Sequence, residues 1–406
     1  MDSPLLTRPC RAEIDLAAFA QNLRLLRSLA GRAGLAAVVK GDAYGHSLAL
    51  CAPAARRAGA DWLAVTSVDE ARAAATGDPQ ADSRILVLSG PFPGDGPWVA
   101  RHGFACSVWH PSHLEELQRG AQQAGASHLS VHLELDTGMS RQGAAPEELA
   151  SFLHALRSFP VLRLDGVMTH LYAADESDHA ATGSQLERLD NGLRQIVRHL
   201  QSTAQPAPQW LSVGNSAAIL DTAIHDRLTA LAEAHGLRLL LRPGIALYGV
   251  APRTEPPLSV ADEAAELRPV LTWKTRITSL RRIPAGEAIG YNATFRAAQP
   301  MRLALLAAGY ADGLSRRLSN VGHALVAGQR APFVGRISMD QAVVDVSHIP
   351  AASLAPGAEV ILLGGQGGQG DEGVQRISAD DHARWAETIP WEVFTSIAAR
   401  VPRIAV

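Results

Sequence analysis

Apolar runs of four to seven residues recur through the first 250 positions, and a stretch with helical spacing follows most of them. A run that ends in a short polar turn is typical of a buried strand. Strands are predicted over residues 35–39, 62–65, 85–88, 104–109, 129–135, 164–168, 210–213 and 237–241. Helices are predicted over residues 46–58, 67–75, 111–124, 146–158, 184–201 and 216–220. Eight strands alternating with helices indicate a parallel sheet, and this number favours a closed (β/α)8 barrel over an open sheet.

A further strand and helix are expected before the barrel units, over residues 10–15 and 16–30. The pattern changes after Val250, because residues 251–257 are rich in proline and are typical of a linker. The later apolar runs are short and often alternate with polar residues, over 271–280, 301–307, 324–326, 341–346 and 359–363. We therefore expect an α/β protein with two domains: a (β/α)8 TIM-like barrel over 1–250 and an all-β domain over 251–406.

The composition excludes several classes of protein. A hydrophobic fraction of 47% and a charged fraction of 19% are typical of a soluble globular chain. The net charge of -3 does not indicate a nucleic-acid or membrane-surface partner, and no apolar run is long enough to span a bilayer. Residues 1–8 lack the pattern of a secretory signal, and three scattered cysteines without metal-ligand spacing favour a reducing cytoplasm. Each cysteine is interpreted as a small buried apolar residue.

Lys40 stands where the first barrel strand opens into a polar turn. It is one of only two lysines among 37 basic Lys and Arg residues; Lys274 is the other. Unlike arginine, lysine can lose its proton and act as an amine nucleophile or a base. The alternative is a lysine that extends along the surface to reach solvent, and this segment alone does not separate the two.

Other polar residues follow the later strands, at the end of the barrel where such folds place their chemistry. The sixth strand ends at His170, the seventh at Asn215 and Ser216, and the eighth at Arg242. A strand that opens a helix at Asn-Ser offers N–H groups and a hydroxyl to an anion. Each residue has a structural alternative: a core histidine, a helix cap, an ion-pair partner. Their occurrence at successive strand ends favours a site that binds a phosphate.

Seven segments resemble, in order, those of the alanine racemase family. Val-Val-Lys-Gly-Asp-Ala-Tyr-Gly-His around Lys40 is similar to the family's pyridoxal-phosphate signature. The others are Leu-Asp-Thr-Gly-Met-Ser-Arg, Asn-Ser-Ala-Ala, Arg-Pro-Gly-Ile-Ala-Leu-Tyr-Gly, Gly-Tyr-Asn-Ala-Thr-Phe, Gly-Tyr-Ala-Asp-Gly and Gly-Arg-Ile-Ser-Met-Asp-Gln. The resemblance spans Val38 to about Arg403. It implies a barrel plus a β domain in a head-to-tail homodimer, pyridoxal 5'-phosphate as cofactor, and interconversion of L-alanine and D-alanine.

The resemblance assigns the two bases of a racemase. Lys40 is the implied Schiff-base lysine and serves one face of the substrate carbon after the substrate amine displaces it. Tyr291 is implied to serve the other face, and in this family it enters from the partner subunit. Arg242 is implied to face the pyridine nitrogen. Because a guanidinium keeps its protons, it leaves that nitrogen unprotonated and makes the ring a poorer electron sink, which favours reprotonation over transamination.

The resemblance also implies the binding contacts. His170 is the expected imidazole against the cofactor ring. The expected phosphate contacts are Tyr44, Ser216, Gly244 and Ile245. Asn215 directly precedes Ser216, at the start of the helix predicted over 216–220. Arg141 and the backbone of the partner's Met339 are the expected contacts to the substrate carboxylate, and Asp340 is expected to orient the Met339 loop or to be an ordinary turn aspartate. Tyr310, Arg336 and Asp175 resemble residues that line the access path, although structural roles explain them equally well.

Two positions depart from the family. Glu134 occupies a position where many members have a carbamylated lysine, and we hypothesise that its carboxylate replaces the carbamate and anchors Arg141. Ala399 occupies a position where some members have a tyrosine that touches the phosphate. Its loss would loosen the phosphate site or widen the pocket, so a racemase for serine or basic amino acids is the first alternative.

Two other functions compete with a racemase. A barrel-type pyridoxal-phosphate decarboxylase is disfavoured by Arg242, because decarboxylation benefits from an acidic partner at the ring nitrogen. A pyridoxal-phosphate carrier is disfavoured by the β domain with Tyr291 and Met339, because carriers resemble the barrel alone. A biosynthetic role, such as supplying D-alanine to the cell wall, and a catabolic role are both compatible with the sequence.

Overall fold

Eight parallel strands close into a barrel in the computed structural model, which describes residues 8–76, 84–176, 178–252, 261–366 and 375–406. They are β2 (Gly34–Val38), β3 (Trp62–Val65), β4 (Arg84–Val87), β5 (Ala105–Val108), β6 (Leu129–Glu134), β7 (Leu162–Met168), β8 (Trp210–Ser212) and β9 (Arg238–Leu241). The ring closes where β2 pairs with β9, with Gly34 opposite Leu240. The predicted barrel is confirmed, strand by strand.

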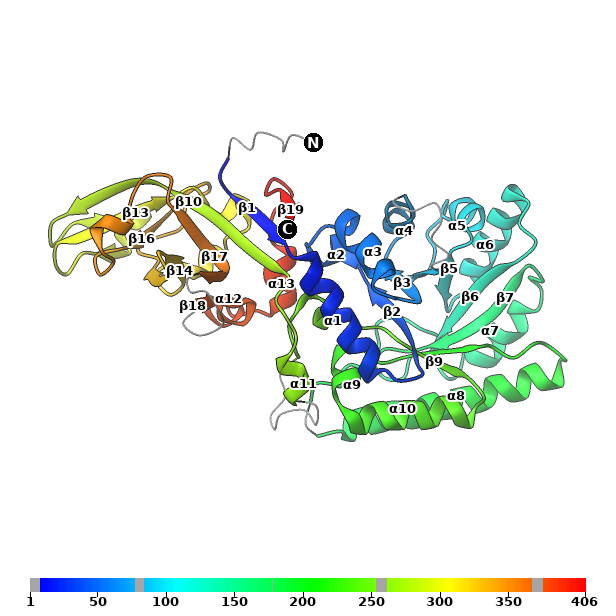
Figure 1. The fold of residues 1–406 in the computed structure, drawn as a ribbon. Helices are drawn as coiled ribbons and strands as arrows, with labels where there is room; N and C mark the ends of the chain where they lie inside the picture. The colour runs from blue at the N-terminus through cyan, green and yellow to red at the C-terminus, as the bar shows by residue number, and fades with distance from the viewer. Residues whose placement is uncertain (1–7, 77–83, 177, 253–260, 367–374) are drawn as a thin grey trace. The chain divides into compact units, whose positions relative to one another are not determined.

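Helices lie outside these strands (Figure 1). They are α1 (Leu16–Leu29), α3 (Leu48–Arg57), α4 (Val68–Ala75), α5 (Gly96–His102), α6 (Pro111–Ala124), α7 (Leu149–Leu156), α8 (Ala180–Ser202), α9 (Ser216–Leu220) and α10 (Thr222–Ala234). The sequence did not predict α5 or α10. The first is only seven residues long and is capped by Gly103. The second buries only a narrow stripe, Ile224, Leu228 and Ala232, which gives a weak helical pattern.

The strands form because their residues are apolar on both faces. Every residue of β2, β3 and β5 is buried, as expected where side chains fill the barrel on one face and meet helices on the other. Cys10, Cys51 and Cys106 are buried and form no disulfide with one another, which confirms their interpretation as small core residues.

The second compact unit is built mainly of strands. Its principal sheet runs β15-β14-β17-β10-β1-β19, and β13, β16 and β18 pair at its sides. The bounds are β1 (Arg11–Ile14), β10 (Leu271–Ile283), β13 (Met301–Leu306), β14 (His323–Val326), β15 (Gln329–Pro332), β16 (Ala342–Asp345), β17 (Glu359–Gln366), β18 (Gln375–Ile377) and β19 (Arg403–Ala405). A separate two-stranded sheet joins β11 (Ala288–Ile289) to β12 (Phe295–Arg296). The unit also contains α12 (Ala379–Ala386) and α13 (Pro390–Thr395), which the expectation of an all-β domain did not include.

The two units alternate along the chain. The barrel unit comprises Ala17–Ala43 and Leu48–Arg268, and the other comprises the described residues up to Leu16, Tyr44–Ser47 and Pro269–Val406. The early strand β1 pairs antiparallel with β10 and therefore belongs to the second sheet. The predicted ranges 1–250 and 251–406 stay a prediction, and residues 253–257 of the predicted linker lie outside the described residues. No helix in the described part of the chain is long and apolar enough to cross a bilayer.

Candidate active site

Lys40 begins a left-handed turn at the carboxyl end of β2. Gly41, Asp42, Ala43 and Tyr44 have φ values of 63°, 52°, 56° and 54°. Non-glycine residues avoid this region, and such strain persists only where surrounding contacts impose it. Two carboxylates hold the turn: Glu70 accepts hydrogen bonds from the N–H of Gly41 (2.6 Å) and of Thr66 (2.8 Å), and Asp42 accepts one from Leu48 N–H (2.6 Å). Such imposed strain is typical of functional sites.

The half-buried amine of Lys40 lies in a positive environment. Burial, together with the charges of Arg141 and Arg242, lowers the pKa of Lys40, although Glu70 opposes the shift. These surroundings increase the fraction of neutral amine, which is the nucleophilic form.

Arg242 is buried at the end of β9 and is fixed by two neighbouring strands. It donates to Ser212 Oγ and to the backbone oxygen of Thr169, both at 2.8 Å. Burial lowers the pKa of Arg242 to about 10 against the opposing charge of Glu134, so the guanidinium stays protonated at neutral pH. Its other three N–H groups donate to no described residue, so they are available to a ligand.

His170 follows β7 and is held through its backbone. Gln185 of α8 donates to the His170 carbonyl oxygen (2.9 Å) and to Thr137 Oγ1 (3.0 Å), which ties together the loops after β6 and β7. Burial, with Arg242 and Arg141, lowers the pKa of His170 to about 3. The imidazole is therefore neutral at pH 7 and presents an uncharged ring.

Ser216 joins the ends of β8 and β9. Its Oγ accepts hydrogen bonds from the N–H groups of Gly244 (3.0 Å) and Ala246 (3.2 Å), so its own proton is left to donate to an anion. Ile245 lies between these donors and begins the 3-10 helix η1 (Ile245–Tyr248). Asn215 caps α9 by accepting from Ala218 N–H (3.1 Å), which was its structural alternative.

Glu134 ends β6 as a buried carboxylate. It accepts hydrogen bonds from Ser107 Oγ (2.9 Å) and Gln142 Nε2 (2.7 Å). Burial raises its pKa, while these bonds and the charges of Arg242 and Arg141 oppose the shift. No hydrogen bond joins Glu134 to Arg141 among the described residues, so any anchoring of Arg141 acts through charge, and the anchoring hypothesis stays untested. Glu134, Arg141 and His170 also line a small pocket at the ends of β6 and β7.

Most of the remaining predicted residues belong to the second unit, including Tyr310 and Arg336, whereas Asp175 lies in the barrel unit. Tyr44 is buried, and burial raises its pKa to about 12, so the phenol keeps a proton to donate. Tyr291 lies in the 3-10 helix η2 (Tyr291–Ala293) and is 66% exposed, and Met339 is 54% exposed. Asp340 and Ala399 lie on surface loops. Their roles in the site stay predictions.

Sequence reasoning missed several supporting residues. Glu70, Gln185 and Ser212 position the Lys40 turn, the strand-end loops and Arg242 respectively. Ser67-Val68-Asp69-Glu70 has the Ser-x-x-Glu spacing that marks a helix start, and this signal could have drawn attention to Glu70. Gln185 and Ser212 lie within ordinary helix and strand patterns, so only the fold brings them to the site.

The donor set fits pyridoxal phosphate. The chain provides an amine with a lowered pKa for an aldehyde, a protonated guanidinium for a ring nitrogen, and a hydroxyl proton for a phosphate. All three come from the barrel unit, at the carboxyl ends of β2, β8 and β9.

Comparison with known proteins gives a consistent result. Residues 14–252 match the family model of the alanine racemase N-terminal domain, and residues 270–405 match that of the C-terminal domain. An alanine racemase of Sorangium cellulosum is 39% identical, and the match covers 98% of each chain. The solved alanine racemase of Streptomyces coelicolor superposes with a TM-score of 0.85 at 35% identity, covering all of both chains.

A second solved structure, the alanine racemase of Bartonella henselae with covalently bound pyridoxal phosphate, superposes with a TM-score of 0.80 at 28% identity. The match covers 98% of this chain and 99% of the Bartonella henselae chain. By these matches along nearly its whole length, the chain belongs to the alanine racemase family of isomerases.

Proposed function

We propose that this chain interconverts L-alanine and D-alanine with pyridoxal 5'-phosphate, by a two-base mechanism that uses Lys40 and the partner subunit's Tyr291. When bound, the cofactor acidifies the substrate Cα–H by delocalising its electrons. Lys40 moves a proton at Cα on one face, and the phenol of the partner's Tyr291 moves one on the other. Lys40 or the partner's Tyr291 removes a proton on one face, and the other residue delivers a different proton on the opposite face, which inverts the configuration.

The chain's own residues divide the binding work. Lys40 would hold the cofactor covalently, Arg242 would donate to its ring nitrogen, and the His170 ring would lie against it. The phosphate would be held by Tyr44, Ser216, Gly244 and Ile245, with Asn215 at the adjoining helix start. Arg141 and the backbone N–H of the partner's Met339 hold the substrate carboxylate, and Asp340 supports the Met339 turn.

The observation that carries the proposal is the buried Arg242, fixed by Ser212 and Thr169 and protonated at neutral pH. A guanidinium at the ring nitrogen would keep that nitrogen unprotonated and the ring a poor electron sink. The electron pair left at Cα would then be protonated rapidly in preference to other reactions. This supports a racemase over a decarboxylase. We further propose that the enzyme is a cytoplasmic homodimer that supplies D-alanine for cell-wall synthesis.

The test is an incubation of the cofactor-loaded protein in D2O with separate L-isomers of alanine, serine, lysine, arginine and glutamate. Chiral chromatography with mass detection reports the D-isomer and Cα deuterium together. We expect D-alanine carrying one deuterium, with the other amino acids nearly inert. Rapid turnover of serine or a basic amino acid would change the substrate and give a role to Ala399. Release of CO2 without a D-isomer would contradict the racemase.

A further inference from the structure

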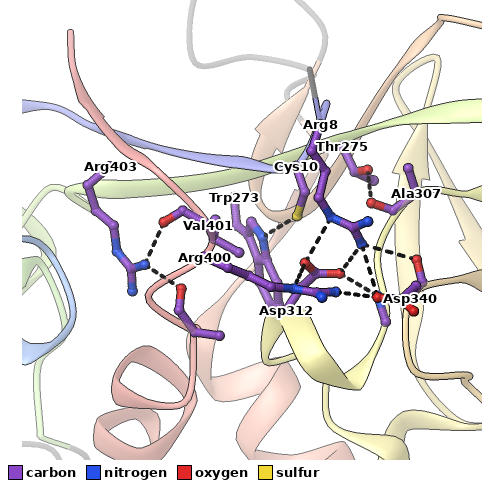
Figure 2. Close-up of polar contacts among 12 residues, drawn as sticks. Arg8, Cys10, Trp273, Thr275, Ala307, Asp312, Asp340, Arg400, Val401 and Arg403 are labelled. Carbon is purple, nitrogen blue, oxygen red and sulfur yellow. Dashed lines mark hydrogen bonds and ion pairs between the residues drawn. The ribbon is translucent and has the colours of Figure 1, made fainter. Parts of the chain in front are cut away.

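Four charged residues from distant parts of the chain meet in the second unit (Figure 2). They are Arg8, Asp312, Asp340 and Arg400, called here the Asp312 cluster. Asp312 ends the 3-10 helix η3 (Tyr310–Asp312), and Asp340 follows Met339 in the turn of residues 338–341. The cluster therefore joins two surface turns to residues near both ends of the chain.

The carboxylate of Asp312 is fully buried and fully used. It accepts four hydrogen bonds: from Arg8 Nε (3.2 Å) and Nη2 (2.6 Å), Arg400 Nε (2.8 Å) and Gly309 N–H (2.9 Å). A carboxylate has about four acceptor sites, so none is left for water. Burial alone would raise the pKa of Asp312, but the bonds from Arg400 and Arg8 outweigh it and leave the pKa below its ordinary value.

Both arginines reach from Asp312 to the second turn. Arg400 donates through Nε to Asp312 and through Nη2 to Asp340 Oδ1 (2.7 Å), so one planar side chain spans two carboxylates. Arg8 donates through Nη2 to the Asp340 carbonyl oxygen (3.2 Å). Arg400 thereby fixes the separation of the turns, because the nitrogens of a guanidinium are held in one plane.

The backbones of the two turns are also bonded. Tyr310 N–H donates to Ser338 O (3.0 Å), and Ala311 N–H donates to Met339 O (2.9 Å). The approach requires Gly309, because a Cβ there would lie 2.3 Å from Ser338 O and 2.4 Å from Met339 O. The carbonyl of Met339 is thus held, whereas its N–H donates to no residue in the described part of the chain.

We infer that Asp312 and Arg400 are positioning residues that fix the 338–341 turn so that the Met339 N–H is presented to the substrate carboxylate. This inference rests on the proposed function for the role of Met339. The hold on the turn itself rests on the contacts of the Asp312 cluster. Neither Asp312 nor Arg400 touches substrate; both act through the turn.

The experiment compares four variants in the full-length, cofactor-loaded protein. Asp312→Asn removes the charge, and Arg400→Met removes both bridging bonds. The matched control is Asp381→Asn, because Asp381 also pairs with two arginines, Arg330 (3.1 Å) and Arg384 (2.6 Å), but contacts neither turn. A fourth variant, Arg400→Lys, keeps the charge, but its single nitrogen cannot reproduce the guanidinium fork.

Hydrogen exchange of Tyr310, Ala311 and residues 336–342 measures the hold on the turn, and steady-state kinetics measure its effect. We expect faster exchange and a KM for alanine raised roughly tenfold in Asp312→Asn and Arg400→Met, with kcat changed less, since a contact made equally in ground and transition states affects KM. Arg400→Lys should give an intermediate KM. Asp381→Asn should leave both readouts unchanged.

Sedimentation at the assay concentration must first show the same oligomeric state for all variants. Unchanged exchange in both Asp312→Asn and Arg400→Met would overturn the positioning role whatever the activity. Faster exchange with unchanged KM would also overturn the inference, because the turn would then be held for another purpose. Absence of alanine racemisation in the wild type would defeat the proposed function instead, and the exchange comparison would still test the hold on the turn.

Discussion

The two units use charge in opposite ways. In the barrel, Lys40, Arg141 and Arg242 are gathered so that burial and mutual repulsion lower the pKa values of Lys40 and Arg242. In the second unit, Asp312 and Arg400 are paired, so the pKa of the acid falls and that of the base rises. Paired charges stabilise one conformation, whereas like charges in a buried site cost free energy unless a ligand compensates them. The group of like charges formed by Lys40, Arg141 and Arg242 is therefore a better indicator of chemistry than the Asp312 cluster.

Lys40→Arg should break this contrast most severely. Arginine keeps a positive charge but has no amine that can be neutral, so racemisation should fall by at least about three orders of magnitude. Absorbance of the bound cofactor measures the loss of its attachment to the protein, and D-alanine production measures the loss of racemisation. Lys274→Arg is the matched control, because Lys274 forms ion pairs with Glu13 (2.8 Å) and Glu359 (3.3 Å) and should tolerate arginine. Equal losses in both variants would remove the special role of Lys40.

Arg242→Gln tests the positive environment of Lys40 directly. Removing this cation should raise the pKa of Lys40, because Arg242 now lowers it. Less neutral amine would then be present at a given pH, so cofactor-free protein should react more slowly with an amine-directed reagent at Lys40 near neutrality. We expect racemisation to fall roughly 100-fold, the lower end of the contribution of one well-placed catalytic group. The pH dependence of labelling supplies the test, and an unchanged profile would contradict the electrostatic account.

Asp312→Asn tests whether the paired charges of the second unit stabilise its fold. The folded-state pKa of Asp312 lies below its unfolded value, so its ion pairs stabilise the protein above the unfolded pKa of about 4 and are lost as pH falls through the folded pKa. The variant should lose about 2 kcal/mol of unfolding free energy at pH 7, since Arg8 and Arg400 are partly exposed. Urea unfolding between pH 3 and 7 measures this, and the difference from wild type should shrink with acidification.

The sequence predicted the barrel well because its strands are continuous apolar runs and its chemistry follows them immediately. Lys40 and Arg242 could be placed at strand ends without any structure, since parallel strands bring those ends together. The Asp312 cluster could not be predicted this way. Its members lie up to 392 positions apart, from Arg8 to Arg400. The arginines precede β1 and β19, the aspartates flank β13 and β16, and only the sheet brings these strands together. The link between Arg8 and Asp340 likewise has no local pattern.

Glu134→Gln should change the free energy of unfolding least, and it should stabilise the protein where Asp312→Asn destabilises it. The folded-state pKa of Glu134 is raised, so the folded barrel favours the protonated acid, and its charge destabilises the fold increasingly as pH rises from the unfolded pKa of about 4 through the folded one. A neutral glutamine should therefore raise the thermal midpoint of cofactor-free protein at pH 7, by an amount equivalent to about 1 kcal/mol or less.

The same substitution should raise the KM for alanine several-fold, if the carboxylate steadies Arg141 through charge. Glu116→Gln is the control, because Glu116 is also buried in the barrel unit but binds Gly94, Gly96 and Arg119 instead. Unchanged activity and substrate affinity in Glu134→Gln would end the anchoring hypothesis. A lowered thermal midpoint would show that the Glu134 carboxylate stabilises the barrel as Asp312 stabilises its own unit. The two units would then no longer differ in how a buried carboxylate affects stability.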